Sequence, residues 1–258
     1  MNSATLLQTG ALLTNAPEEA YAATVSESHR KALGQFFTPA PIAEFMARWV
    51  TANPQCRIIL DPAVGLGVFF RAIDKVKPRQ NYQFVGYDVD PQVLRQAALL
   101  LNAELKNEDY LFNGWDAKYD GIICNPPYFK FQDYQNRRAG LLELQERLGF
   151  NLSGFTNIYT MFLLKSLSQL APQGRAAFLV PFEFLNADYG AIVKKHLLES
   201  GALRYAILFS PCPTSAKKRS PKWWTPCVRA GSPPAPRRNG SSTTSPPSSA
   251  TRPCTAWR

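Results

Sequence analysis

The chain has 258 residues, of which 45% are hydrophobic and 19% charged. This composition is typical of a globular protein and excludes a collagen-like, coiled-coil or wholly disordered chain. The length suits one large α/β domain, or one ordinary domain with an appendage, and excludes two full catalytic domains. The net charge of +10 is unevenly placed, since all 19 acidic residues lie between Glu18 and Glu199 whereas Lys and Arg continue to Arg258.

The sequence predicts neither a membrane span nor a secretory signal. No run of eighteen apolar residues occurs, and no basic residues precede the apolar ones at the amino terminus. We therefore expect a cytoplasmic protein. The cysteines lack the close spacing of a zinc site or disulfide framework, and Cys56 and Cys124 are interpreted as small apolar residues of strands. His29 and His196 lie far apart, which disfavours a metal centre.

Short apolar runs alternate with longer helical patterns between residues 18 and 210. Residues 18–33 form a polar helical stretch, and Thr38 and Pro39 are expected as the N-cap and first residue of the next helix. The expected strands are 57–60, 82–90, 119–124, 175–180 and 203–209. The expected helices between them are 68–76, 91–105, an amphipathic 157–170, and 189–200. This pattern predicts a doubly wound α/β sheet, Rossmann-like, whose ligands bind beyond the carboxyl ends of its strands.

The strand at 57–60 runs into DPAVGLGVF (61–69). Gly65 and Gly67 allow a tight turn and close approach of the backbone to a ligand. Such a turn alone fits a dinucleotide site or a plain tight connection. Asp61 would repel a pyrophosphate but suits a ligand with an ammonium group, which favours S-adenosylmethionine over NAD.

A second acid ends the next strand in VGYDVDP (85–91). A carboxylate at such a strand tip can accept both hydroxyls of a ribose. Asp90 is the alternative acid, but its position directly before Pro91 is more typical of a helix cap. We therefore favour Asp88 for the ribose.

The sequence NPPY follows the strand at 119–124 and is the most specific of these motifs. Its two prolines fix the backbone and remove two donors. The Asn125 oxygen and the Pro126 carbonyl then form a pair of acceptors that suits an NH₂ group on a planar ring, and Tyr128 offers a face on which the ring can stack.

GQFFTP (34–39), DPAVGLGVF (61–69), FVGYDVDP (84–91) and DGIICNPPY (120–128) occur in this order. Together they resemble the motifs of the gamma-type adenine-N6 DNA methyltransferases of restriction–modification systems. The similarity covers about residues 28–210, and it implies a Rossmann-like methyltransferase catalytic domain there, with an N-terminal extension at 1–27.

The resemblance also implies which residues hold the cofactor, S-adenosylmethionine. Its methionine end would contact Phe37, Thr38 and Pro39. The methionine and ribose side would be lined by Asp61, Pro62, Ala63, Gly65 and Gly67. Asp88 would take the ribose hydroxyls, and Asp109 would meet the adenine ring with Tyr110 beside it; Asp116 is an alternative to Asp109. Later motifs wall the adenine pocket, and there Phe182 is given only a structural role.

The catalytic residues implied by the resemblance are Asn125, Pro126, Pro127 and Tyr128. They would act on double-stranded DNA from which an adenine has been flipped, without a metal and without a membrane. A cognate restriction endonuclease or a specificity subunit is the implied protein partner. NPPY also occurs in methyltransferases of ribosomal RNA and of protein glutamine, so these substrates are alternatives, as is an inactive remnant that binds cofactor or DNA.

The sequence departs from the family pattern after about residue 210. Residues 211–258 contain 10 prolines and 9 Lys or Arg but no acid and no Leu, Ile or Phe, so we expect a disordered basic tail. It stands where the family has a further strand, a second aromatic against the flipped base and a target-recognition domain. This abrupt change indicates a frame-shifted or truncated gene, and a natural DNA-binding tail is the competing interpretation.

Overall fold

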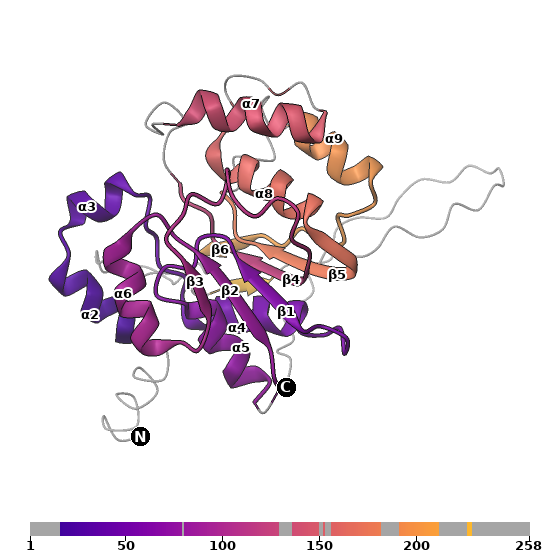
Figure 1. The fold of residues 1–258 in the computed structure, drawn as a ribbon. Coiled ribbons are helices and arrows are strands. Elements are labelled where there is room, and N and C mark those ends of the chain that lie inside the picture. Colours follow the sequence, from indigo (N-terminus) through magenta and orange to yellow (C-terminus); the bar gives the residue numbers. More distant parts are fainter. Residues whose placement is uncertain are drawn as a thin grey trace, which may run out of the picture. The chain divides into compact units, whose positions relative to one another are not determined.

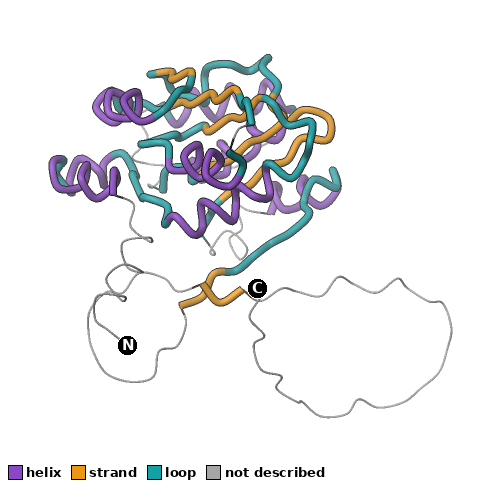
Figure 2. Tube along the Cα trace, turned by 90° about the horizontal axis from the view of Figure 1, so that it is seen from below, coloured by secondary structure: helices purple, strands orange, loops and turns teal. Residues whose placement is uncertain are grey.

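The computed structural model describes residues 16–78, 80–128, 136–149, 152, 156–181, 191–211 and 226–228. It divides into two units, residues 1–204 and 205–258. The first unit holds a five-stranded parallel sheet in the order β3-β2-β1-β4-β5, with helices on both faces (Figure 1). Figure 2 shows the same layers from below. The expected doubly wound α/β fold is therefore confirmed.

The strands are β1 (Ile58–Asp61), β2 (Gln83–Tyr87), β3 (Glu104–Lys106), β4 (Tyr119–Cys124) and β5 (Leu170–Phe178). β1 pairs with β2 on one side and with β4 on the other. The strand order reverses between β1 and β4, and such a switch point is where open α/β sheets bind ligands. Asp61 ends β1 and Asn125 follows β4, so two of the three motifs meet at this point.

Helices α4 (Ala40–Val50) and α5 (Val68–Val76) cover one face of the sheet. Phe70 of α5 stacks on Phe84 of β2, with 4.5 Å between ring centroids. A Cβ at Gly121 of β4 would lie 2.6 Å from Val50, so glycine allows α4 to approach the strand closely. These contacts pack α5 against β2 and α4 against β4, beneath the loops that carry the motifs.

Helices α7 (Arg137–Leu148), α8 (Ile158–Ser168) and α9 (Ala191–Glu199) lie on the other face (Figure 1). The prediction of an amphipathic helix at 157–170 is wrong in one respect, because every residue from Ile158 to Ser166 is buried. α8 packs against β5 and α7, so only its last two residues, Leu167 and Ser168, are partly exposed. Leu60, Ile122 and Phe162 belong to the core cluster on this side.

The other helices among the described residues of this unit are α2 (Ala16–Thr24), α3 (Glu27–Ala32) and α6 (Pro91–Leu100). The polar stretch at 18–33 thus forms two helices instead of one. Ser26 separates them, because its side chain accepts a hydrogen bond from the His29 amide and caps α3.

Three local expectations need correction. The run at 91–105 is not one helix, since α6 ends at Leu100 and residues 104–106 pair with β2 as β3. Residues 137–148, to which no element was assigned, form α7. Thr38 is not the N-cap of α4, because Pro39 takes that position and the Thr38 hydroxyl accepts a hydrogen bond from Asn125.

β5 begins earlier than the expected strand at 175–180. Its register shifts between Tyr119 and Gly121 of β4, and Gln173 adopts a positive φ of 64°. Regular pairing runs from Arg175 to Phe178. The sequence prediction therefore located the regular part of β5 and missed the irregular part before it.

The second unit is described through a short antiparallel pair, β6 (Phe209–Pro211) with β7 (Pro226–Val228). Residues 202–208 contain no regular element, so the strand expected at 203–209 is wrong except at its last residue. Strand formation requires a hydrogen-bonded partner, and the partner of Phe209 is Val228. β7 is thus a strand within the segment expected to be disordered. The other residues of 212–258, like Phe182, lie outside the described residues.

Cys56 and Cys124 are both buried, and Cys124 ends β4 as expected. Cys56 precedes β1 and lies in no strand, so the expectation that it is a strand residue is wrong. Burial raises the pKa of Cys56 to about 11. Within the described ranges no helix is long and apolar enough to cross a membrane, and no three His, Cys, Asp or Glu side chains are grouped as metal ligands.

Candidate functional site

The turn after β1 follows the tight course that its glycines predict. Gly65 has a φ of 52° and Gly67 a φ of 78°, both in the left-handed region. A Cβ at Gly67 would lie 2.2 Å from Leu101, whereas a Cβ at Gly65 would meet nothing within 4 Å. Packing and backbone conformation both require Gly67, while the open space beside Gly65 leaves its backbone accessible to a ligand.

Asp88 supports this turn from the residue after β2. Its Oδ2 accepts a hydrogen bond from the Gly65 amide at 3.0 Å, and its Oδ1 accepts one from the Asp90 amide at 2.9 Å. Burial raises the pKa of Asp88 to about 6. A carboxylate has about four acceptor positions, so some are left for the hydroxyl groups of a ligand.

Asp90 is a helix cap, as its sequence position predicts. Its Oδ1 accepts a hydrogen bond from the Gln92 amide at 2.8 Å. Its Oδ2 bonds to the Tyr21 hydroxyl, to His29 Nε2 and to Gln35 Nε2 at 3.1, 3.0 and 2.8 Å. This convergence of α2, α3 and the following loop on one carboxylate has no local sequence signal, because the partners are 55 to 69 residues away.

Asp61 lies deeper than the sequence interpretation assumed. It is fully buried, and its Oδ1 accepts a hydrogen bond from the Ala63 amide at 3.1 Å. Its Oδ2 is buried without a hydrogen-bond partner in the described part of the chain. Burial raises the pKa of Asp61 well above its ordinary value. Pro62 beside it is also buried.

The two residues expected near the adenine of the cofactor differ in their surroundings. Asp109 is half-buried and follows β3 at the carboxyl edge of the sheet, whereas Asp116 is exposed and precedes β4 at the opposite edge. This placement favours Asp109 over Asp116. Tyr110 is 2% exposed, and its ring packs on Phe162 at 5.2 Å between centroids. Tyr110 therefore belongs to the core and fits a supporting role better than contact with a ligand.

Side chains of α8 hold the loop after β3 from within the protein. Buried Lys165 donates hydrogen bonds to the carbonyl oxygens of Tyr110 and Asn113. Gln169 accepts a bond from the Tyr110 hydroxyl at 2.6 Å and donates one to the Gly114 carbonyl. Burial lowers the pKa of Lys165 to about 7. A buried lysine in an apolar helix was a signal that the sequence analysis missed.

Asn125, directly after β4, has a fixed side-chain orientation. Its Nδ2 donates to the Phe36 carbonyl at 2.9 Å and to Thr38 Oγ1 at 3.0 Å. Because a carbonyl can only accept, this pair of bonds identifies the nitrogen. The Asn125 Oδ1 is buried and has no partner among the described residues. A preoriented acceptor is therefore available beside the glycine turn.

Tyr128 is the last residue of the NPPY motif. The two prolines before it are at least half-buried. Its hydroxyl donates a hydrogen bond to the Leu179 carbonyl at 2.6 Å, which fixes the ring. The ring lies 5.6 Å from that of Phe36 at an interplanar angle of 37°. Phe36 is 53% exposed and was not among the predicted site residues.

A small cavity of about 40 Å³ lies where these segments meet. It is too small for a complete nucleotide cofactor, since ligand pockets usually measure about 300–1,000 Å³. Its lining combines residues 36–38, the glycine turn, the start of α5, Asn125 and one residue of α2. The lining residues are Glu18, Phe36, Phe37, Thr38, Ala63, Val64, Gly65, Leu66, Val68, Phe69 and Asn125.

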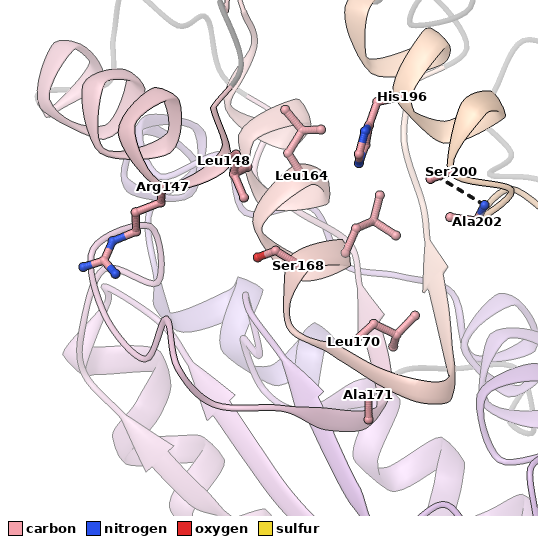
Figure 3. Close-up of a pocket in the computed structure, with 10 residues that line it drawn as sticks. Arg147, Leu148, Leu164, Ser168, Leu170, Ala171, His196, Ser200 and Ala202 are labelled. Atoms are coloured by element: carbon pink, nitrogen blue, oxygen red, sulfur yellow. Dashed lines mark hydrogen bonds between the residues drawn. The ribbon is translucent and has the colours of Figure 1, made fainter.

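A larger cavity of about 430 Å³ lies elsewhere, between α7, α8, β5 and α9. Figure 3 shows Leu164, Leu170 and His196 around it. It lies beside the first residues of β5, at the sheet edge opposite to Asn125, and none of the predicted site residues line it. Size alone therefore does not identify the functional site.

Comparison with known proteins agrees with this geometry. The family model of the N-6 DNA methylases matches residues 19–212. The chain belongs to the N-6 DNA methylase family. The family resemblance found in the sequence is thereby confirmed, and the match contains all four motifs.

Two similar proteins show what share of a longer methyltransferase this chain matches. The chain is 45% identical over 201 residues to the Type II methyltransferase M.AccI of Acinetobacter calcoaceticus, covering 76% of this chain and 37% of that protein. It is 26% identical to M.HincII of Haemophilus influenzae, covering 72% of this chain and 35% of that protein. The chain thus spans about a third of these relatives' length.

Solved structures support the fold. The methyltransferase subunit of a type I restriction-modification system from Streptococcus thermophilus is 23% identical, with a TM-score of 0.54, over 65% of this chain and 39% of that one. A protein of Listeria monocytogenes assigned as a class I S-adenosylmethionine-dependent methyltransferase has a TM-score of 0.50 at 20% identity, over 62% and 50%. The fold of this N-6 DNA methylase is that of S-adenosylmethionine-dependent methyltransferases.

Proposed function

We propose that this chain binds S-adenosylmethionine at the carboxyl ends of β1, β2 and β4 and transfers the methyl group to the N6 amino group of adenine in DNA, within a restriction–modification system. The observation that carries this proposal is the buried, unpartnered Oδ1 of Asn125. Membership of the N-6 DNA methylase family supports this proposal. The same membership does not favour ribosomal RNA or protein glutamine as the substrate.

The residues at these strand ends fit the cofactor. The backbone at Ala63 and Gly65 is accessible and would lie along the methionine and ribose, with Asp61, Pro62 and Gly67 shaping the turn. Asp88 would accept hydrogen bonds from the ribose hydroxyls, and Asp109 would accept one from the adenine amino group. Phe37, Thr38 and Pro39 would close over the methionine end.

When bound, S-adenosylmethionine supplies an electrophilic methyl group on a sulfonium. The chain's part is to prepare the adenine nitrogen, whose lone pair is conjugated with the ring. Asn125 Oδ1 and the Pro126 carbonyl would accept the two amino hydrogens and localise that lone pair toward the methyl group. Pro127 would keep this carbonyl rigid. The chain's contribution to an in-line displacement, in which S-adenosylhomocysteine leaves and one amino proton is lost to solvent, would be orientation and aimed dipoles.

The adenine must leave the DNA stack to reach Asn125, at a cost of a few kcal/mol. Stacking on Tyr128 would return about 1–3 kcal/mol. The hydroxyl bond from Tyr128 to Leu179 holds the ring in place for this contact.

Substitution Asn125→Ala tests the proposal. It should lower methyl transfer to unmethylated plasmid DNA by at least about a hundredfold, as loss of an aimed polar group does. The affinity for S-adenosylmethionine, measured by calorimetry, should change less than about twofold, because Oδ1 faces the acceptor substrate.

The assay combines the full chain with a second polypeptide, the part of M.AccI that lies outside the 201 matched residues. N6-methyladenine is quantified by mass spectrometry. Glu108→Gln, at an exposed acid, is the matched control. Undiminished adenine methylation by Asn125→Ala would remove Asn125 from the mechanism.

A further inference from the structure

Glu18 of α2 is a buried acid that none of the sequence motifs contains. Its side chain is 3% exposed, and its Oε1 accepts a hydrogen bond from the Arg71 guanidinium. Its Oε2 is buried and has no partner in the part of the chain that the structure describes. Glu18 lines the small cavity together with Thr38, Gly65 and Asn125.

Arg71 does not donate a hydrogen bond to Glu18 Oε2. A guanidinium can satisfy both oxygens of a carboxylate through two parallel hydrogen bonds. Arg71 instead donates one nitrogen to Glu18 Oε1 and another to the Leu66 carbonyl at the glycine turn. Leaving a buried carboxylate oxygen without a donor is costly, so the position favours a ligand that supplies one.

Glu18 also differs from Asp61, the acid that the sequence assigned to a cationic ligand. Asp61 is fully buried, is raised in pKa and does not line the cavity. Glu18 lies on the cavity wall, paired with a permanently charged guanidinium. An ammonium group bound beside the glycine turn would therefore meet the Glu18 carboxylate more directly than that of Asp61.

We propose that Glu18 Oε2 accepts a hydrogen bond from the α-ammonium group of the methionine part of S-adenosylmethionine. This inference rests on the proposed function and extends the cofactor site to α2, outside the four motifs. Arg71 would act as a positioning residue that holds the Glu18 carboxylate against the glycine turn.

Calorimetry on the full chain with two ligands tests this contact. S-adenosylhomocysteine carries the ammonium group, whereas 5′-methylthioadenosine keeps the adenosine and the thioether and lacks the amino acid. Glu18→Gln should weaken S-adenosylhomocysteine binding by about tenfold or more, as loss of a charge-assisted bond does, and leave 5′-methylthioadenosine binding within about twofold. The exposed neighbour provides the control Glu19→Gln, which should alter neither affinity.

Equal losses for both ligands, or no loss for either, would overturn the role of Glu18. Failure of the unsubstituted chain to bind either ligand would instead reject the proposed cofactor site as a whole. If thermal unfolding shows that Glu18→Gln does not fold, Glu18→Asp replaces it, because it keeps the charge and withdraws the oxygen by one bond. The same selective loss for S-adenosylhomocysteine is then expected, and its absence contradicts the proposal.

Discussion

Three buried acceptor oxygens without partners surround the glycine turn: Glu18 Oε2, Asp61 Oδ2 and Asn125 Oδ1. Each such atom costs about 1–3 kcal/mol in a folded protein. They are half of the unpartnered buried side-chain atoms found in the described residues, and they come from α2, β1 and the end of β4. Their concentration at the topological switch point indicates a site built to receive hydrogen-bond donors.

Asp88 should make cofactor binding depend on pH. Ribose hydroxyls donate to the ionised carboxylate, and the pKa of Asp88 is raised to about 6 by burial. Ionisation is therefore lost as the pH falls through 6, and the affinity for S-adenosylmethionine should drop by about tenfold between pH 7 and pH 5. Calorimetry over this range checks the effect.

The matched variant for this pH dependence is Asp88→Asn. It should bind more weakly at pH 7 and show a flatter pH profile, whereas Glu108→Gln should keep the profile of the unsubstituted chain. An Asp88→Asn profile as steep as that of the unsubstituted chain would assign the titration to another group.

At the scale of elements, α8 serves the site without reaching it. Lys165 and Ser166 of α8, and the C-cap residue Gln169, all bond to the loop after β3. The rings of Tyr110 and Trp115 lie 4.1 and 4.5 Å from the Lys165 nitrogen. A buried polar helix end thus fixes the loop that presents Asp109.

Lys165 should give the fold a measurable pH dependence. Its pKa is about 7 in the folded chain and about 10.5 in the unfolded chain, so the unfolded chain binds more protons between these values. The free energy of unfolding should therefore rise with pH in that window. Between pH 7 and 8.5 the gain relative to Lys165→Met should be about 1–2 kcal/mol.

Urea unfolding at several pH values measures this difference, and Met is chosen because it keeps the volume of the side chain. The exposed residue Lys195 supplies the control Lys195→Met. Parallel stability profiles for the unsubstituted chain and Lys165→Met would contradict the buried, titrating amine.

At the scale of the whole molecule, the candidate site draws on segments from α2 to the end of β4, so a ligand there joins the N-terminal helices to the sheet. Binding to the folded state alone adds about 2.7 kcal/mol at a ligand concentration of one hundred times Kd. For a folded unit of this size the melting temperature should rise by roughly 5–10 °C. Differential scanning calorimetry with S-adenosylmethionine measures the shift, and NAD should produce none. The absence of any shift with millimolar S-adenosylmethionine would reject the proposed site.

Sequence patterns were sufficient to predict the family, the parallel α/β fold and the strand ends that carry the motifs. These features depend on local chemistry. Gly65 and Gly67 are needed where φ is positive, Asp90 caps the helix that starts beside it, and the prolines after Asn125 act on their own backbone. For these residues the cause and the effect lie within a few positions of the chain.

Tertiary structure alone decided what each side chain faces. Tyr110 is turned into the core by α8, Asp61 is buried behind the turn, and Glu18 reaches the cavity from 53 residues before its partner Arg71. β3 forms because β2 supplies its hydrogen bonds, although its residues continue a helical pattern. Such outcomes depend on strand pairing and burial between segments that are distant in the sequence. Hydrophobic periodicity and motif spacing describe only nearby residues, so they do not predict these contacts.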